Sequence, residues 1–339
     1  MEVELMKRVA INGLGRIGRL VLRRYIETKP DDIEIVALNK PSTTEEMAYF
    51  IKYDSIHGRA RFPVDYDDTS LILDGKKYPL FGDRDPLKLP WKDLGVDIVL
   101  ECTGVFTKKE QAGLHIESGA KKVIISAPSP DADLSVVMGV NEDHYDPANH
   151  DVLSNASCTT NSIAPALKVL NDAFGVEYLM GTTIHAYTPS QRLLDSPKGG
   201  QRKNRAAALS LIPASTGAAK ALIPLFPDLK GKMSMSAVRV PIPDGSLSDL
   251  VIHFKKDAGA EDVNKALKEA AEGRLKGILE YSEDELVSAD IIGNPHSGIV
   301  DALSTRSVVD KVAKVMIWYD NEYGYAARTL ELAQYMAAR

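Results

Sequence analysis

The sequence has 339 residues, of which 44% are hydrophobic and 26% charged, and its formal net charge is −6. This length allows two domains with separate cores, and the sequence contains neither an apolar run long enough to span a membrane nor a basic stretch that favours nucleic acid. The N-terminal residues lack the apolar segment of a signal peptide, and the two cysteines lack metal-ligand spacing. We therefore expect a cytoplasmic protein without a bound metal and without nucleic-acid or membrane partners.

The N-terminal region has the pattern of a dinucleotide-binding unit. An apolar segment at 8–11 is followed by the glycine motif at 13–18 (GLGRIG), a helical pattern, and a second apolar segment at 33–38. Glycines at this place permit a tight turn and let a pyrophosphate approach the N-terminus of a helix. The sequence therefore predicts a βαβ unit that binds a dinucleotide.

The second predicted strand lacks the carboxylate that usually binds the adenosine ribose of NAD. The strand ends at Asn39, and Lys40 follows, with hydroxyl side chains at 42–44. A cation and hydroxyls suit a 2′-phosphate, and the missing carboxylate removes the repulsion that disfavours NADP. We predict that NADP is preferred to NAD, although an exposed loop lysine would give the same pattern.

Two further buried strands are predicted at 96–100 and 122–126, with a helix at 108–118 between them. Together with the first two strands they indicate a doubly wound parallel sheet, whose ligands bind at the C-terminal ends of the strands. Cys102 follows one of these strands, but no histidine or second cysteine lies near it in the sequence, so we expect it to be structural.

The segment 154–161 (SNASCTTN) places Cys158 before an apolar pattern typical of a helix. Unpaired N–H groups at a helix N-terminus lower the pKa of a thiol, which favours a nucleophile. Two observations oppose this interpretation: a free cysteine is commonly a small buried hydrophobe, and Pro165 favours a later helix start that would leave Cys158 in the preceding turn. A partner base must decide between them.

The C-terminal half changes to longer alternating segments, which predict a mixed or antiparallel sheet. The predicted strands are 180–188, 235–241, 248–254 and 312–319, and the predicted helices are 205–211, 214–223, 261–273 and 323–337. A polar segment at 188–204 is long enough to indicate binding or assembly. His185 and His253 both lie in strands; the hydroxyl neighbours of His185 favour it as the base without excluding His253.

The chain resembles the phosphorylating glyceraldehyde-3-phosphate dehydrogenases over nearly its whole length. The segments that carry the resemblance are 10–19 (AINGLGRIGR), 52–58 (KYDSIHG), 121–128 (KKVIISAP), 154–161, 213–220 (PASTGAAK), 238–241 (VRVP) and 318–322 (WYDNE). The resemblance implies a Rossmann domain with a doubly wound parallel sheet at 1–157 and 321–339. It also implies an α+β catalytic domain at 158–320, and a homotetramer in which the 188–204 loop approaches the cofactor of a neighbouring subunit.

The resemblance also implies the reaction. Cys158 would attack the aldehyde of glyceraldehyde 3-phosphate, and His185 would act as its ion-pair partner and base. A hydride would pass to NADP or NAD, and inorganic phosphate would release 1,3-bisphosphoglycerate from a thioester, in a reversible reaction. A cysteine suits this chemistry because its thioester stays activated toward a second nucleophile.

The motifs and the resemblance together assign the binding residues. For the cofactor they are Gly13, Arg16, Ile17, Asn39, Lys40, Thr103, Gly104, Phe106, Ser126, Ser196, Asn321 and Tyr325. For the substrate phosphate and the attacking phosphate they are Ser157, Thr159, Thr188, Lys203, Thr216, Gly217 and Arg239. Hydroxyls, backbone N–H groups and a guanidinium form a suitable cradle for phosphate.

Departures from the family leave alternatives open. Ser196 stands where NAD-specific members often carry a leucine, which favours NADP, whereas the retained Pro197 allows use of both cofactors. A family arginine falls at Lys203, beside Arg202, so either cation could serve the anion site.

Two other functions remain open. The segment 294–301 resembles erythrose-4-phosphate dehydrogenases, although the intact segment 213–220 favours glyceraldehyde 3-phosphate. A non-catalytic binding protein on the same fold is the other alternative, and the retention of both Cys158 and His185 argues against it.

Overall fold

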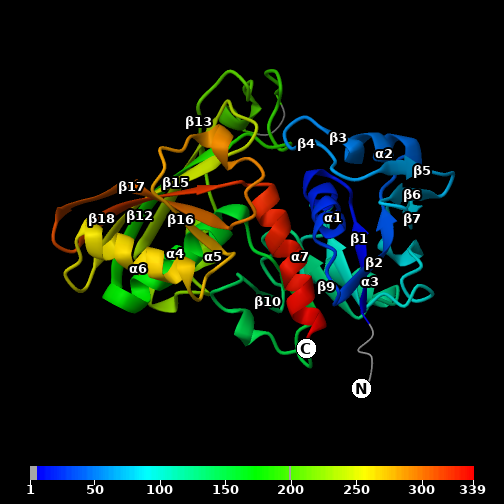
Figure 1. The fold of residues 1–339 in the computed structure, drawn as a ribbon, viewed down its shortest axis with the longest axis horizontal. Helices are drawn as coiled ribbons and strands as arrows, with labels where there is room; N and C mark the ends of the chain where they lie inside the picture. Colours follow the sequence, from blue (N-terminus) through cyan, green and yellow to red (C-terminus); the bar gives the residue numbers. More distant parts are fainter. Residues whose placement is uncertain (1–5, 198–199) are drawn as a thin grey trace. The chain divides into compact units, whose positions relative to one another are not determined.

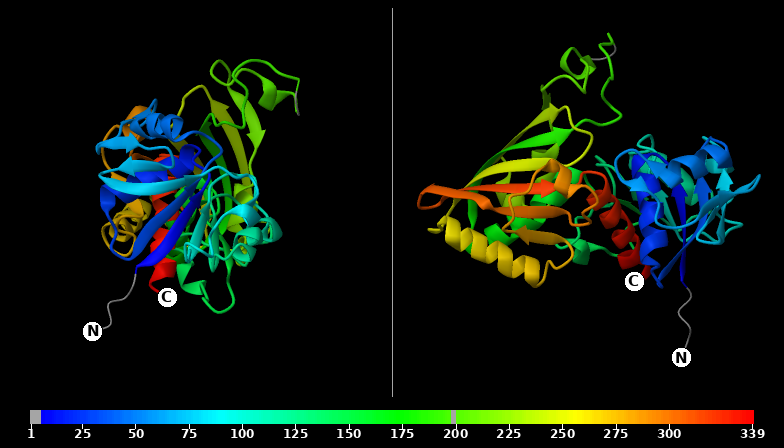
Figure 2. Two further views of the ribbon diagram at one scale, coloured as in Figure 1. Left: turned by 90° about the vertical axis from the view of Figure 1, so that its right-hand side faces the viewer. Right: turned by 45° about the horizontal axis from the view of Figure 1, so that its top comes forward.

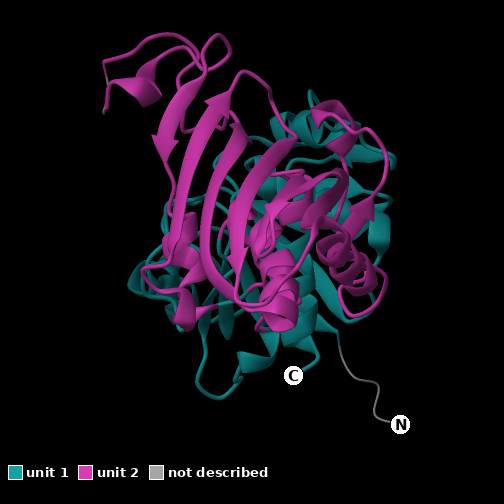
Figure 3. Ribbon diagram, turned by 90° about the vertical axis from the view of Figure 1, so that its left-hand side faces the viewer, with its two compact units in different colours: residues 1–136, 142–156, 326–339 teal, residues 137–141, 157–325 magenta. Residues whose placement is uncertain are grey.

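The computed structural model describes residues 6–197 and 200–339, and the chain divides into two compact units (Figure 3). Unit 1 comprises residues 1–136, 142–156 and 326–339, and unit 2 comprises residues 137–141 and 157–325. The predicted domains, 1–157 with 321–339 and 158–320, differ from these units at residues 137–141, 157 and 321–325, which group with unit 2.

Unit 1 is built on a nine-stranded sheet with the order β10-β11-β9-β8-β1-β2-β7-β6-β5 (Figure 1). Seven of its strands pair in parallel: β1 (Lys7–Asn12), β2 (Ile33–Asn39), β7 (Lys76–Phe81), β8 (Ile98–Glu101), β9 (Lys122–Ile125), β10 (Leu134–Ser135) and β11 (Val152–Ser154). Because β1 is central and its neighbours extend to both sides, the predicted doubly wound parallel sheet is confirmed. The C-terminal ends of β1, β2 and β8 meet at one edge, which positions the first candidate site.

Beside β2, the sheet is extended by β7 (Lys76–Phe81), β6 (Ser70–Leu73) and β5 (Val64–Tyr66). Asp74 and Gly75 connect β6 to β7 as a two-residue turn, and both have positive φ, 49° and 81°. Two residues with positive φ match the right-handed twist of a hairpin, which explains the Asp-Gly pair. A separate small ribbon consists of β3 (Tyr53–Asp54) and β4 (Gly58–Arg59).

The helices of unit 1 are α1 (Arg16–Thr28), α2 (Thr44–Lys52), α3 (Lys109–Glu117) and most of α7 (Tyr323–Ala337). Thr43 and Glu46 form a capping box that fixes the start of α2. The C-terminal helix α7, red in Figure 1, lies beside α1, where Gln334 Nε2 donates to Asp32 Oδ1 at 3.0 Å and Glu331 pairs with Arg24 at 3.6 Å. The end of the chain thereby returns to the first β-α-β unit.

Unit 2 is built on a seven-stranded mixed sheet with the order β13-β14-β12-β15-β18-β17-β16 (Figure 2). Its strands are β12 (Val176–Ala186), β13 (Ile212–Ser215), β14 (Met233–Val240), β15 (Ser246–Phe254), β16 (Leu279–Ser282), β17 (Gly298–Val309) and β18 (Val312–Tyr319). The pairs β12–β14 and β16–β17 are parallel and the others antiparallel, which confirms the predicted mixed sheet. In β18 every second residue is buried, as expected for a strand with one face on the core.

The helices of unit 2 are α4 (Cys158–Phe174), α5 (Ala218–Leu222) and α6 (Ala260–Glu272). Single 3-10 turns occur in both units, at Pro86–Lys88, Glu142–His144, Arg202–Asn204, Pro227–Leu229 and Ser288–Ile291. The helix predicted at 205–211 is wrong: Ala207 N donates to Arg192 O at 2.9 Å, so this backbone is bonded to the preceding loop instead of to itself. Across the described residues, we find no helix with the length and apolarity required to cross a membrane.

Candidate active site

Cys158 is the first residue of α4 in unit 2. The preceding residue, Ser157, caps the helix, and its Oγ accepts a hydrogen bond from Thr160 N at 3.0 Å. Pro165 lies inside α4, so the later helix start that it suggested is wrong. The residues around Pro165 are buried. The free energy gained from this burial and from the cap offsets the cost of the backbone hydrogen bond that proline removes.

His185 lies on β12, and its Nε2 is 3.5 Å from Cys158 Sγ. The ring is 5% exposed and packs edge-on against Tyr319, with ring centroids 6.0 Å apart. The parallel register of β12 and β14 places Arg239 directly opposite His185. Sheet pairing between distant segments thus brings an imidazole and a guanidinium together, and the start of α4 adds the thiol.

The contacts of His185 Nδ1 determine which ring nitrogen carries hydrogen. Nδ1 lies 2.7 Å from Ala186 O and 2.8 Å from Arg239 Nη1. A carbonyl oxygen can only accept, and Arg239 Nη1 also donates to Ala186 O at 2.9 Å. We therefore assign the hydrogen to Nδ1, since both donors are then satisfied by the same carbonyl. In the neutral ring with this tautomer, Nε2 presents a lone pair to Cys158 Sγ, 3.5 Å away.

Burial dominates the protonation of this pair. It raises the pKa of Cys158, and the charge of Arg239 and hydrogen bonds from Thr159 lower the same pKa by less. Burial and then the charge of Arg239 lower the pKa of His185 to about 4. Burial thus favours a thiol facing a neutral imidazole, and the charge of Arg239 and the hydrogen bonds from Thr159 favour the thiolate that the resemblance implies. The desolvation cost of two isolated charges explains the effect of burial.

Tyr319, at the end of β18, is a site residue that the sequence did not reveal. Its buried hydroxyl lies 3.0 Å from Thr159 Oγ1 and 2.7 Å from Thr183 Oγ1. Burial, followed by the charge of Cys158, raises the pKa of Tyr319, which keeps the phenol protonated. These contacts tie the first turn of α4 to strand β12 and so fix Cys158 relative to His185. The sequence signals were its place at the end of an alternating strand and within the segment 318–322 that carries the resemblance, neither of which indicated its contacts.

Asn321 is held by a hydrogen-bond chain that begins next to His185. Ser246 Oγ accepts from Ala186 N at 3.1 Å and donates to Asn321 Oδ1 at 2.6 Å. The amide of Asn321 is thereby oriented with its oxygen toward β15, so its Nδ2 hydrogens can be donated to a ligand.

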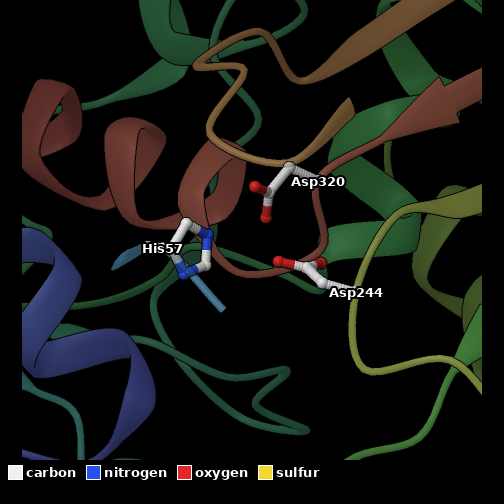
Figure 4. Close-up of side chains that lie close together, drawn as sticks. All are labelled: His57, Asp244 and Asp320. Carbon is white, nitrogen blue, oxygen red and sulfur yellow. The ribbon is translucent and has the colours of Figure 1, made fainter. Parts of the chain in front are cut away.

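Two buried aspartates lie around the turn that carries Asn321 (Figure 4). Asp320 accepts from Tyr323 N at 2.6 Å and from Gly293 N at 2.7 Å, which fixes the start of α7. Asp244 accepts from Gly245 N at 2.9 Å, and one of its oxygens lies within 4.8 Å of an oxygen of Asp320. His57, drawn in the same figure, belongs to unit 1, where its Nδ1 is 3.6 Å from Asp54 Oδ1.

The residues predicted to bind phosphate all belong to unit 2 but have different surroundings. Arg239 contacts His185 directly. The hydroxyls of Ser157 and Thr159 bond to Thr160 Oγ1 at 2.7 Å and to Tyr319 at 3.0 Å, so they have partners within the protein.

The other predicted phosphate ligands lie on loops and short elements. Thr188 Oγ1 is 2.8 Å from Ser190 Oγ, and Thr216 Oγ1 accepts from Ala218 N at 3.2 Å. Gly217 caps α5, and Lys203 is an exposed residue of the 3-10 turn at Arg202–Asn204. Hydroxyls that bond only to each other or to a cap can exchange that partner for an anion at modest cost.

Unit 1 contains a separate pocket of about 390 Å³ at the C-terminal ends of β1, β2 and β8. Five of the predicted cofactor residues line it: Gly13, Asn39, Lys40, Thr103 and Phe106. A Cβ on Gly13 would lie 2.7 Å from Thr103 N, and one on Gly18 would lie 1.9 Å from Gly13 O. Only glycines allow this close approach, as a pyrophosphate turn requires. The pocket also contains Arg84, a second cation that the sequence did not reveal, because it follows a separate strand.

The remaining predicted cofactor residues do not line this pocket among those the structure describes. Arg16, Ile17, Gly104 and Ser126 lie in unit 1, while Ser196, Asn321 and Tyr325 lie in unit 2. Arg16 begins α1, and its guanidinium binds Asp54 through both Nη atoms. Burial alone would raise the pKa of Asp54, but hydrogen bonds from His57 and Arg16 lower it strongly. Arg16 is therefore the half-buried ion-pair partner of the buried Asp54 in this structure.

Comparisons with known proteins agree with this geometry. The family model for the NAD binding domain of glyceraldehyde 3-phosphate dehydrogenase matches residues 7–109, and the model for its C-terminal domain matches residues 157–321. Glyceraldehyde-3-phosphate dehydrogenase of Priestia megaterium is 53% identical over 332 residues, which cover 98% of each chain. Glyceraldehyde-3-phosphate dehydrogenase of Thermotoga maritima is 53% identical over 330 residues, 96% of this chain and 99% of that one. The chain belongs to the glyceraldehyde-3-phosphate dehydrogenase family of NAD(P)-dependent oxidoreductases.

Proposed function

We propose that this chain oxidises glyceraldehyde 3-phosphate with NAD(P) and inorganic phosphate to 1,3-bisphosphoglycerate, reversibly, through a thiohemiacetal and a thioester on Cys158. The observation that carries the proposal is the 3.5 Å contact between Cys158 Sγ and His185 Nε2 at the first residue of α4. A nucleophile within reach of an oriented base is the arrangement that acyl transfer needs. In this proposal residues 1–157 and 321–339 bind the cofactor, and residues 158–320 carry the chemistry.

The neutral pair supports general-base catalysis. The sulfur of Cys158 forms a bond to the aldehyde carbon while its proton passes to His185 Nε2, which then protonates the substrate oxygen. His185 next takes the proton of the thiohemiacetal hydroxyl as hydride leaves the carbon; bound NAD(P) supplies the hydride acceptor. Phosphate oxygen then attacks the thioester carbon, the C–S bond breaks, and the thiolate of Cys158 recovers a proton.

Phosphate binding is the second part of the proposal. We assign the substrate phosphate to Thr188 and Arg239, and the attacking phosphate to the group Ser157, Thr159, Thr216, Gly217 and Lys203. The support is that Arg239 places a positive charge beside the reacting pair. In addition, the first turn of α4 offers backbone N–H groups without helical partners, which favour an anion.

Rapid mixing of enzyme, cofactor and aldehyde tests the reaction type. Without phosphate we expect a burst of about one reduced cofactor per active site, because the thioester accumulates. Addition of phosphate should restore turnover. The control is the same reaction mixture without phosphate, in arsenate-free buffer. A steady rate that does not depend on phosphate would contradict the phosphorylating step.

Erythrose 4-phosphate, assayed in parallel, should give a lower kcat/KM than glyceraldehyde 3-phosphate; the reverse order would favour the alternative dehydrogenase.

NADP preference is supported by the charges of the unit 1 pocket. Lys40 and Arg84 both line it, and neither forms an ion pair with another described residue. The carboxylate in the lining, Asp83, accepts a hydrogen bond from Asp85 N at its Oδ1, at 2.9 Å. Two available cations suit a 2′-phosphate, and no carboxylate follows β2 directly. Ser196, in unit 2, is the second residue to which we assign this preference.

Steady-state kinetics of Lys40→Asp with both cofactors tests the preference. We expect kcat/KM for NADP to fall about 10–100-fold, the value of a hydrogen bond to a charged group, while kcat/KM for NAD rises. Lys88→Asp is the matched control, because Lys88 is an exposed lysine of the same unit outside the pocket. Wild-type enzyme that works better with NAD than with NADP would contradict the proposal.

A homotetramer is the proposed assembly. Support comes from exposed apolar residues of unit 2: Leu193, Leu194, Leu209 and Leu211 are each at least 70% exposed in the single chain. Tyr178 and Met180 are also exposed on one face of β12, and Val251 is paired with Met180 on the same face. Exposed apolar patches of this kind mark interfaces.

Light scattering should give a mass four times that of one chain. The double variant Leu194→Asp, Leu209→Asp should have a lower mass, and a monomeric wild type would contradict the assembly.

A further inference from the structure

A chain of buried polar side chains crosses the parallel sheet of unit 1, and two of its members, Asn12 and Asn39, line the cofactor pocket. Its members come from three neighbouring strands, from α3 and from the segment before β8, and each is at most 4% exposed: Asn39, Asn12, Glu101, His115 and Trp91. Neighbouring members lie within hydrogen-bond distance of one another. Buried polar groups are costly without partners, so the direction of each bond can be worked out from the ends.

The Trp91 end fixes the tautomer of His115. Trp91 Nε1 lies 2.9 Å from His115 Nδ1, and an indole nitrogen can only donate. His115 Nδ1 therefore carries no hydrogen, and the ring is neutral. Its hydrogen is on Nε2, which donates to Glu101 Oε2 at 3.0 Å.

The Asn39 end is fixed by a backbone carbonyl. Asn39 Nδ2 lies 2.8 Å from Asp83 O, which can only accept, so the amide nitrogen is identified. The same Nδ2 donates to Asn12 Oδ1 at 2.6 Å, and Asn12 Nδ2 donates to Glu101 Oε2 at 2.5 Å. Both ends of the chain thus donate toward one carboxylate.

Glu101 is the acceptor at which these bonds converge. Besides His115 and Asn12, it accepts from Thr103 N at 2.8 Å and from the Thr103 hydroxyl. Each of these partners has a hydrogen to give, a pattern that an ionised, acceptor-only carboxylate satisfies. Its negative charge is what orients Asn12, and through Asn12 it orients Asn39.

One atom of this buried hydrogen-bond chain has no hydrogen-bond partner among the described residues. Both hydrogens of Asn39 Nδ2 are used, and Asn39 Oδ1 is buried without a partner among the described residues. Asn39 lines the cofactor pocket, next to Lys40. A buried acceptor without a donor carries a desolvation penalty that a ligand hydroxyl can remove.

We propose that Glu101 is a positioning residue for the cofactor, which acts through Asn12 to hold the Asn39 carbonyl oxygen ready to accept a hydroxyl of the adenosine ribose. The inference rests on the proposed binding of the adenosine half in this pocket. In NADP the 2′ oxygen carries the phosphate, so the 3′-hydroxyl is the donor that remains. Lys40 then binds the phosphate and Asn39 the hydroxyl, two adjacent residues with complementary tasks.

Binding of NADP and of 3′-deoxy-NADP to the full-length enzyme tests this inference by calorimetry. In the wild type we expect removal of the hydroxyl to weaken binding about tenfold, the value of one hydrogen bond to a buried acceptor. In Glu101→Gln the amide can donate, Asn12 loses its fixed orientation, and the two ligands should bind within about twofold of each other. Asp97→Asn is the matched control: Asp97 directly precedes β8 at the other end of this strand, bonded to Arg8 N at 2.8 Å, and the tenfold difference should persist.

The outcomes separate the inference from the function on which it rests. A tenfold difference that persists in Glu101→Gln overturns the positioning role while leaving the pocket assignment intact. No difference in the wild type overturns the binding of the ribose hydroxyl by Asn39. If Glu101→Gln does not yield folded protein, Asn12→Ala interrupts the same chain without removing the charge. In Asn12→Ala, loss of the difference supports the inference, and its persistence overturns it.

Discussion

The two cysteines, one in each unit, have opposite surroundings. Burial raises the pKa of Cys102 to about 12; a hydrogen bond with Ser126 lowers it slightly, and the charge of Glu101 raises it further. Burial also raises the pKa of Cys158, but Arg239 and Thr159 act against it. Cys102 follows a strand beside a carboxylate, whereas Cys158 begins a helix beside a guanidinium. The neighbouring charge, and not burial alone, decides which thiol can react.

Two buried histidines, one in each unit, also differ in their surroundings. His115 in unit 1 is held between a tryptophan and a carboxylate, so both ring nitrogens have partners within the protein. His185 in unit 2 has one nitrogen on a backbone carbonyl and the other on the Cys158 thiol, with a cation nearby. The first histidine orients other groups, and the second keeps a lone pair for proton transfer.

The largest effect should come from exchanging the two cysteines for serine in turn. Cys158→Ser removes the nucleophile, and we expect kcat to fall on the order of 10⁴-fold or more. Cys102→Ser should keep kcat within about threefold, because Cys102 has no base beside it. Alkylation by iodoacetamide followed by peptide mass spectrometry should label Cys158 well before Cys102. Faster labelling of Cys102 would contradict the conclusion that Cys158 is the more reactive thiol.

A smaller effect on kcat is expected when the histidines of the unit 2 sheet are replaced one at a time. His185→Asn should lower kcat about 10²–10⁴-fold, the usual contribution of a general base. The control is His253→Asn: His253 stacks on Tyr178 at 4.5 Å and contacts Glu177 at 2.8 Å, so its loss should leave kcat nearly unchanged. Equal losses in the two variants would remove the distinction between them.

Next in size is the effect of the guanidinium. Arg239→Gln removes the charge that lowers the pKa of Cys158, so the rate of alkylation should reach its plateau at higher pH than in the wild type. We expect kcat/KM for the aldehyde to fall about 100-fold, since hydrogen bonds to charged groups contribute about 1.5–3 kcal/mol. Arg306→Gln is the control, because Arg306 bonds to Thr305 O at 2.8 Å on β17. An unchanged alkylation profile in Arg239→Gln would show that the charge does not act on the thiol.

The smallest effect concerns stability and pH. Between pH 6.5 and pH 4 the unfolded chain protonates His185 while the folded chain does not, because the folded pKa is lowered to about 4. The free energy of unfolding should therefore fall as pH falls, by about 2 kcal/mol between pH 7 and pH 5 from this residue. Urea unfolding at both pH values should show a smaller fall in His185→Asn than in His253→Asn. The same fall in both variants would mean that His185 is not shielded from protons.

The sequence determined the features that depend on neighbours along the chain. The glycine motif at 13–18 opens α1, the Asp74–Gly75 pair turns a hairpin, and Cys158 begins a helix, all through local conformational preferences. Alternation of apolar residues identified four of the seven strands of the mixed sheet, β12, β14, β15 and β18, and missed β13, β16 and β17. Where local preference was weak, as at 205–211, hydrogen bonds to a distant loop prevailed and the predicted helix is absent.

Only the tertiary structure decided the chemistry of the sites. The register of β12 with β14 places Arg239 beside His185, and it is His185 that contacts the thiol, while His253 contacts Glu177. Burial favours the neutral forms of the pair, an effect that no local pattern encodes. Glu101 orients Asn39 across three strands whose residues are up to 89 positions apart in the chain. Such contacts and the desolvation that accompanies them arise from packing, so the sequence can name candidate site residues but not their protonation or orientation.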